Sequence, residues 1–119
     1  IIMGYCTSYK LSMVEGDDEL INIFRKECDG ANYALDEWGD SNDSCKWYDS
    51  KKDIIEFSKK YTDAIFLLEG EGEENGDLWK LYVKDGHTQE CKAKMVYPEF
   101  DKSKLLADIR ESKINKVLE

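Results

Sequence analysis

Histidine and proline are scarce in this chain, which contains one of each, His87 and Pro98. Nucleophilic hydrolysis of the serine or cysteine kind needs an imidazole beside the nucleophile. Because the single histidine directly follows the turn dipeptide Asp85-Gly86, we expect it to be a solvated turn residue. The sequence therefore offers no residue set for this chemistry, and we expect a protein that is not an enzyme.

Long apolar runs and paired cysteines are missing as well. No apolar stretch approaches the roughly 20 residues that a membrane-spanning helix needs, and no secretory signal is recognised. We therefore expect a cytoplasmic protein that does not bind membranes. The cysteines are spread along the chain without a C-x-x-C pair, which argues against a zinc site and favours reduced, buried thiols: Cys6, Cys28, Cys45 and Cys91.

Acidic residues, in contrast, are abundant. The chain has 26 Asp and Glu against 17 Lys and Arg, a net charge of −9. Binding to duplex nucleic acid depends on Lys and Arg that neutralise phosphates, so direct nucleic-acid binding is not expected. An acidic balance instead favours partners with a basic surface. At 119 residues, of which 41% are hydrophobic, the chain is expected to form one domain, residues 1–119.

The first half of the chain predicts strands and helices in alternation. Residues 4–14 alternate between larger apolar and smaller or polar side chains, which is the period of a half-buried strand. Residues 17–28 carry three acids in the first turn and apolar residues at helical spacing, which predicts a helix. The segments that follow are less regular: a short helix or a strand over 31–38 with Tyr33, Ala34 and Trp38 directed to the core, a flexible loop over 39–44, and a short strand over 45–49.

The second half contains the clearest pattern. Ser50 resembles the first residue of a capping box and opens a helix that ends near Tyr61. Asn75-Gly76 and Asp85-Gly86 are dipeptides that type I′ hairpin turns select, because both central residues need positive φ. Three antiparallel strands are therefore expected within Ala64–Tyr97. In the third, the residues expected on the core face are Cys91, Ala93, Met95 and Tyr97, and Pro98 ends that strand.

A last helix is expected over residues 102–119, capped by Asp101 or Ser103. Its apolar stripe is interrupted between Ile109 and Ile114, so its end is expected to fray or to seek a partner. A homodimer through this helix or through a sheet edge is one possibility. The predicted fold class is α+β: a mainly antiparallel sheet that ends in a three-strand meander, with helices on one face and a C-terminal helix.

Residues 38–86 resemble a known group. The segment WGDSNDSCKWYD, a helix ending in FSKKY, and FLLEGEGEENGDLWKLYVKDG are similar to small phage and plasmid proteins related to the YubB-like ferredoxin-like family. The resemblance implies a ferredoxin-like sheet and an origin in a phage or other mobile element. It implies no catalytic activity. Separately, no cofactor is expected for this chain.

The acidic stretch Glu69–Asp77, at the first hairpin, is the main candidate site. Its side chains Glu69, Glu71 and Glu73 are spaced by two, so in an extended segment they share a face, roughly 7 Å apart, and repel one another. Four roles are open: a divalent-metal site, a glycosidase-like acid pair, a surface for a basic partner, or plain solvation that protects a sheet edge. The candidate partner-binding acids are Glu69, Glu71, Glu73, Glu74 and Asp77.

Two adjacent aromatic residues complete the candidate site. A short strand cannot bury both Trp47 and Tyr48 on one face, so one of them is expected to contact a partner. The hypothesis favoured by charge, size and resemblance is a non-enzymatic binding protein that docks on a basic surface of a host protein in the host cytoplasm. Where that surface normally binds nucleic acid, the chain would act as a mimic and anti-defence inhibitor. The alternative is a metal-dependent enzyme or small-ligand-binding protein that uses the Glu69–Asp77 carboxylates.

Overall fold

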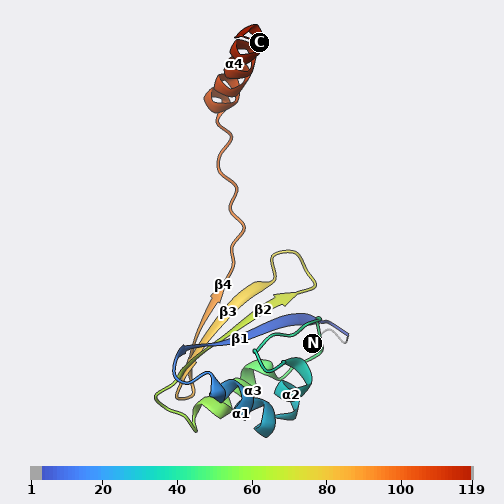
Figure 1. Cartoon of the computed structure of the whole chain (residues 1–119), viewed down its shortest axis with the longest axis vertical. Helices are drawn as coiled ribbons and strands as arrows, with labels where there is room; N and C mark the ends of the chain where they lie inside the picture. The colour runs from blue at the N-terminus through green and yellow to red at the C-terminus, as the bar shows by residue number, and fades with distance from the viewer. Residues whose placement is uncertain (1–3, 119) are drawn as a thin grey trace.

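The computed structural model describes residues 4–118, with side chains up to Ile114. Its elements along the chain are β1 (Thr7–Glu15), α1 (Glu19–Glu27), α2 (Asp29–Ala34), α3 (Ser50–Ser58), β2 (Ile65–Gly72), β3 (Leu78–Lys84), β4 (His87–Lys92) and α4 (Lys102–Leu118). The strands form an antiparallel sheet in the order β1-β2-β3-β4 (Figure 1). The predicted α+β class and the C-terminal helix are confirmed.

The order of elements differs from that of a ferredoxin-like domain. A ferredoxin-like chain runs β-α-β-β-α-β, whereas here α1, α2 and α3 all lie between β1 and β2, and no helix follows until after β4. Strand β1 pairs with β2 from Thr7 opposite Gly72 to Glu15 opposite Ile65, and its register shifts between Met13 and Glu15. The sheet is therefore a meander whose first connection contains three helices.

Helices α1, α2 and α3 lie together on one face of the sheet (Figure 1). Strands β1, β2 and β3 each send alternate apolar residues toward these helices, as the period-two pattern predicts. Ring contacts join the layers: the centroid of Phe57 in α3 lies 4.8 Å from that of Phe24 in α1 and 5.7 Å from that of Phe66 in β2. The largest side chains less than 2% exposed are Phe24, Phe66, Leu11, Ile54, Leu68 and Val83.

The two predicted hairpin turns differ in their outcome. Asp85 and Gly86 have φ values of 47° and 75°, so both residues are left-handed as a type I′ turn requires. In the first hairpin only Gly76 has a positive φ, 83°, and residues 73–77 connect β2 to β3. The type I′ turn predicted at Asn75-Gly76 is therefore wrong, and a longer loop replaces it.

Two predicted strands are also corrected. Strand β4 ends at Lys92, and all its residues are exposed because it is the edge strand that the three helices leave uncovered. Cys91, Ala93, Met95 and Tyr97 are consequently exposed and do not form a core face. The strand predicted over Cys45–Asp49 is reduced to one bridge between Cys45 and Thr7, followed by a turn.

Residues 93–118, here called the tail, stand away from residues 4–92, here called the body (Figure 1). Asp101 caps α4, since its Oδ1 accepts a hydrogen bond from the Ser103 backbone N–H at 2.9 Å. The tail gives the molecule extents of 67 × 34 × 26 Å. Helix α4 therefore does not cover the sheet, unlike the other three helices.

Candidate functional site

The acidic loop between β2 and β3 is closed by its own backbone. The Gly72 N–H donates to the Asp77 carbonyl oxygen at 2.8 Å, and the Asp77 N–H donates to the Glu74 carbonyl oxygen at 3.1 Å. Gly76, with its positive φ, permits the reversal between these two bonds. These bonds fix the backbone conformation of the loop that carries the acidic side chains.

Two of these carboxylates bind the segment that leads into β1. The Tyr5 hydroxyl donates to Asp77 Oδ2 at 2.5 Å, and the Cys6 N–H donates to Glu73 Oε1 at 2.8 Å. The hydrogen bond to Asp77 is the main reason why the pKa of the Tyr5 phenol is raised. Glu73 and Asp77 thus make hydrogen bonds within the molecule, and the side chains of Glu71, Glu73 and Glu74 are all exposed.

Glu69 belongs to a different part of the surface. It lies in β2 on the sheet face that no helix covers, where its carboxylate is 3.7 Å from Lys80 Nζ. The other cross-strand neighbour of Glu69 is Lys10, which pairs at 2.8 Å with Asp40, and this hydrogen bond raises the pKa of Lys10. The five predicted acids therefore do not converge. Within residues 4–118, no three His, Cys, Asp or Glu side chains are grouped to hold a metal ion.

The structure separates Trp47 from Tyr48. Trp47 is 3% exposed, and its Nε1 donates to Asp53 Oδ2 at 2.8 Å. It is a core residue, which corrects its assignment as a partner contact. Tyr48 is 47% exposed, and its hydroxyl oxygen accepts the Gly4 N–H at 2.9 Å. Of the two aromatic residues, Tyr48 is the one that a partner can reach.

The segment predicted as a flexible loop, residues 39–44, is fastened along the free edge of β1. The Leu11 N–H donates to the Gly39 carbonyl oxygen at 2.7 Å, and the Ser41 N–H donates to the Tyr9 carbonyl oxygen at 2.9 Å. The Ser41 hydroxyl also accepts the Tyr9 N–H at 2.6 Å. These bonds satisfy the backbone of an edge strand that would otherwise be open to pairing with another chain.

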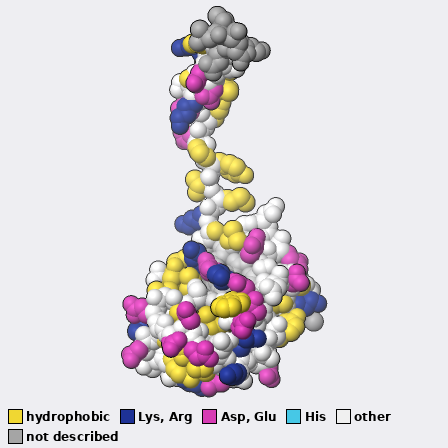
Figure 2. Space-filling model, viewed as in Figure 1, with side chains coloured by type: hydrophobic (Ala, Val, Ile, Leu, Met, Phe, Trp, Pro, Cys, Tyr) yellow, Lys and Arg dark blue, Asp and Glu magenta, His cyan; other side chains and the backbone are white. Residues whose placement is uncertain are grey.

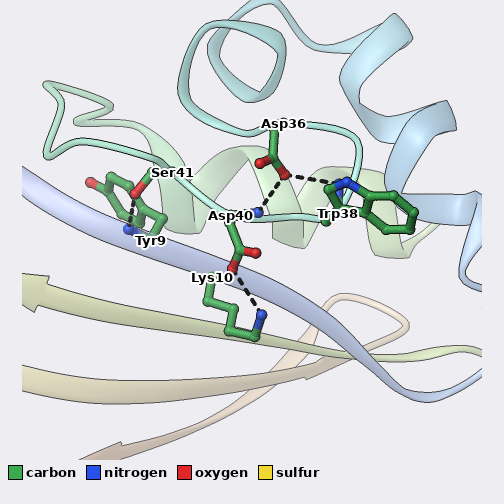
Figure 3. A network of polar contacts seen from close by, with 6 residues as sticks. All are labelled: Tyr9, Lys10, Asp36, Trp38, Asp40 and Ser41. Atoms are coloured by element: carbon green, nitrogen blue, oxygen red, sulfur yellow. Dashed lines mark hydrogen bonds and ion pairs between the residues drawn. The ribbon is translucent and has the colours of Figure 1, made fainter.

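Tyr33 and Trp38 were both expected to face the core, but Tyr33 is 66% exposed and Trp38 is 72% exposed. The turn that carries Trp38 is held by Asp36, whose Oδ1 accepts the backbone N–H of Trp38 at 2.8 Å and that of Asp40 at 3.0 Å (Figure 3). Two backbone hydrogen bonds close the same turn. The Asp36 N–H donates to the Asp40 carbonyl oxygen at 2.8 Å, and the Gly39 N–H donates to the Asp36 carbonyl oxygen at 3.0 Å. An Asp two residues before the Trp and a Gly after it are typical of such turns. This pattern is the sequence signal from which the turn at Trp38 could have been predicted.

These residues define one continuous region, here called the edge surface. It follows β1 from the Trp38 turn, past the segment bonded to Lys10, Tyr9 and Thr7, to Tyr48 and the acidic loop. Its accessible side chains include one basic residue, Lys46, beside Glu37, Trp38, Asp43, Tyr48, Glu73 and Glu74.

The remaining sequence candidates are placed as follows. His87 is exposed at the start of β4, as expected for a solvated residue beside a turn. All four cysteines are free, but they are not buried as predicted: Cys6, Cys28 and Cys45 are partly exposed and Cys91 is exposed. Burial nevertheless raises the pKa of the Cys28 and Cys45 thiols.

No protein-family model, curated protein or solved structure matches this chain. Among the described residues, no helix has the length and apolar character needed to cross a membrane.

Proposed function

We propose that this chain is a non-enzymatic binding protein that docks its edge surface on a basic surface of another protein. The observation that carries the proposal is the exposed Trp38 on a turn fixed by Asp36. A large side chain on a rigid backbone loses little conformational freedom on binding, and tryptophan is prominent among the residues that dominate binding energy at interfaces. The fold does not require Trp38, since its ring is mostly in solvent.

Charge around the tryptophan supports a basic partner. Asp36, Glu37 and Asp43 lie on the same edge as the indole, and Glu73 and Glu74 lie at the far end. An arginine or lysine of the partner can stack on an indole while its charge is attracted by these carboxylates. Such complementarity raises the rate of association and selects against acidic partners.

The biological setting of the proposal rests on the sequence resemblance of residues 38–86. It gives an origin in a phage or other mobile element and a partner in the host cytoplasm. Where the partner's basic surface normally binds nucleic acid, the chain competes for it as a mimic and so acts as an anti-defence inhibitor.

The alternative, a metal-dependent or small-ligand-binding role for Glu69–Asp77, has less support. Glu73 and Asp77 are hydrogen-bonded within the protein, and Glu69 is paired with Lys80. No geometry among the described carboxylates favours this role over docking.

Affinity capture from a bacterial lysate, compared between variants, tests the proposal. We expect Trp38→Ala to reduce the captured partner by about tenfold or more, the range of an interface hot spot, and the pair Glu37→Lys and Glu74→Lys to reduce it as well. Tyr33→Ala is the matched control, because Tyr33 is a similarly exposed aromatic residue, 66% accessible, outside the edge surface. Capture that is unaffected by the Trp38 and glutamate changes contradicts docking through this surface.

A further inference from the structure

The tail presents apolar side chains that are mostly exposed. Every described side chain from Ala93 to Ile114 is exposed. Between the body and α4, Met95, Val96, Tyr97 and Phe100 are 69%, 82%, 85% and 78% accessible. Figure 2 shows these apolar side chains along the connection to α4. Contiguous apolar surface of this kind marks an interaction site.

Helix α4 itself needs a partner to be stable. Isolated helices of about 15 residues are marginal in water, because most helical stability in proteins comes from tertiary packing. Here Leu105, Leu106 and Ile109 are still 44–49% exposed. The helix therefore gains stability only when these side chains dock on an apolar surface.

The uncovered face of the sheet is such a surface. Helices α1, α2 and α3 occupy the opposite face, and the uncovered face contains a hollow of about 550 Å³. Leu78, 45% exposed, and Ala93 contribute apolar surface to the hollow, and the stems of Lys10 and Lys80 border it. The tail leaves the body beside this hollow, since Ala93 is the first residue of the tail.

Charge selects among the ways in which two copies could associate. Helix α4 has five basic residues, Lys102, Lys104, Arg110, Lys113 and Lys116, against Asp108 and Glu111, a net charge of +3. The whole chain carries −9, so the other residues carry −12. Two α4 helices repel each other, and so do two bodies, whereas α4 is attracted to a body.

The connection directs α4 away from its own sheet. The Ala93 N–H makes the last bond to the sheet, to the Leu78 carbonyl oxygen at 2.9 Å. Residues 94–101 then continue past the end of the sheet without a glycine, and Pro98 favours extended backbone at and before its position. Residues 94–101 therefore contain no turn that would fold α4 back onto its own body.

We propose that the tail of one copy docks on the uncovered sheet face of a second copy, with Leu105, Leu106 and Ile109 against the face around Leu78, in a reciprocal dimer. The arrangement is closed and two-fold, because each copy gives one tail and accepts one. It is independent of the edge surface, which lies along β1.

Sedimentation velocity on the full chain is the first test. We expect a mass of about twice the 13.8 kDa of the chain, and a monomer for the double variant Leu105→Asp and Ile109→Asp. The body of this variant is expected to keep its thermal midpoint, because these side chains are exposed in the single chain. A monomeric full chain, or a double variant that remains dimeric, overturns the proposal.

Mixing two defective variants identifies the docking surface. The tail variant, Leu105→Asp with Ile109→Asp, keeps an intact face, and a Leu78→Asp variant keeps an intact tail; each is expected to be monomeric alone. Their mixture is expected to form a heterodimer, because the intact tail meets the intact face. Absence of a heterodimer, despite unchanged circular dichroism of both variants, contradicts docking of tail on face. A Leu78→Asp variant that is dimeric alone would indicate instead that tails pair with each other.

Discussion

Trp47 connects three parts of the body through one side chain. Its ring centroid lies 5.3 Å from that of Tyr9 in β1 and 5.9 Å from that of Phe24 in α1, and its Nε1 donates to Asp53 in α3. Its carbonyl oxygen accepts the Tyr9 hydroxyl at 2.9 Å. The indole N–H is hydrogen-bonded and the ring is packed among other aromatic rings at this position. Trp47 is therefore a structural residue and is not available to contact a partner.

Tyr9 also provides a test of this junction by pH. Burial raises the pKa of its phenol, and burial likewise raises the pKa of the Cys28 and Cys45 thiols. Because the native state holds these protons more tightly, their contribution to stability is complete below the unfolded-state pKa values, about 8.5 for a thiol and 10 for a phenol. It is lost as pH rises through the higher native values.

We therefore expect the urea midpoint to be flat near pH 8 and to decline above about pH 9 to 10. Tyr9→Phe removes the ionisable phenol, so it is expected to reduce the slope above pH 10 while lowering stability at pH 7 through the lost hydrogen bond to Trp47. Urea titrations at a series of pH values measure both effects. An identical alkaline slope in the variant would show that Tyr9 does not titrate differently on folding.

At the level of elements, the segment that covers β1 depends on close backbone contact at Gly39. Its φ is +83°, and an added Cβ would lie 2.1 Å from the Leu11 carbonyl oxygen. That oxygen belongs to the strand to which residues 39–44 are bonded. A side chain at this position would therefore push the Trp38 turn away from the sheet.

Gly39→Ala is expected to destabilise the protein by more than the 1–2 kcal/mol that a left-handed alanine costs, because the contact with Leu11 is lost as well. Gly4→Ala is the matched control: its φ is +87°, but nothing lies within 4 Å of an added Cβ. Urea unfolding gives the free energies, and hydrogen exchange at the Leu11 and Ser41 amides reports whether the segment has detached. Equal losses of stability in the two variants would mean that the contact is relieved without cost.

The elements that could be predicted from the sequence are those with strong local signals. The β2–β4 meander and the Asp85-Gly86 turn follow from period-two alternation and from the need for positive φ. The failures depend on distant parts of the chain. Whether Cys45–Asp49 becomes a strand depends on the edge of β1, and whether β4 has a core face depends on how far three helices reach.

The candidate site was predictable to a similar degree. The acidic loop follows from composition, but its ties to Tyr5 and Cys6 join residues about 70 positions apart, which no local pattern reveals. Trp38 was assigned inward because tryptophan is usually buried, whereas its turn, held by the hydrogen bonds of Asp36, leaves the side chain 72% exposed.

At the scale of the whole molecule, the basic tail extends away from the acidic body. The radius of gyration is 21.2 Å, whereas a compact domain of this length has about 13.5 Å. The excess of acids on the body creates repulsion within it that salt screens over a length of about 10 Å at 0.1 M. Stability should therefore depend on ionic strength more than on the identity of the cation.

Thermal unfolding in NaCl and in MgCl₂, CaCl₂ or MnCl₂ at equal ionic strength tests this expectation. Screening predicts that the midpoint rises with salt and that the divalent ions add little beyond it, because Glu69 is paired with Lys80 while Glu73 and Asp77 are bonded to the segment before β1. A site filled at 100 times its dissociation constant would instead add about 2.7 kcal/mol, a shift of roughly 10 °C in a domain of this size. A rise of that size with one divalent ion alone, abolished by Glu71→Gln with Glu74→Gln, would favour metal binding over the docking role of the acidic loop.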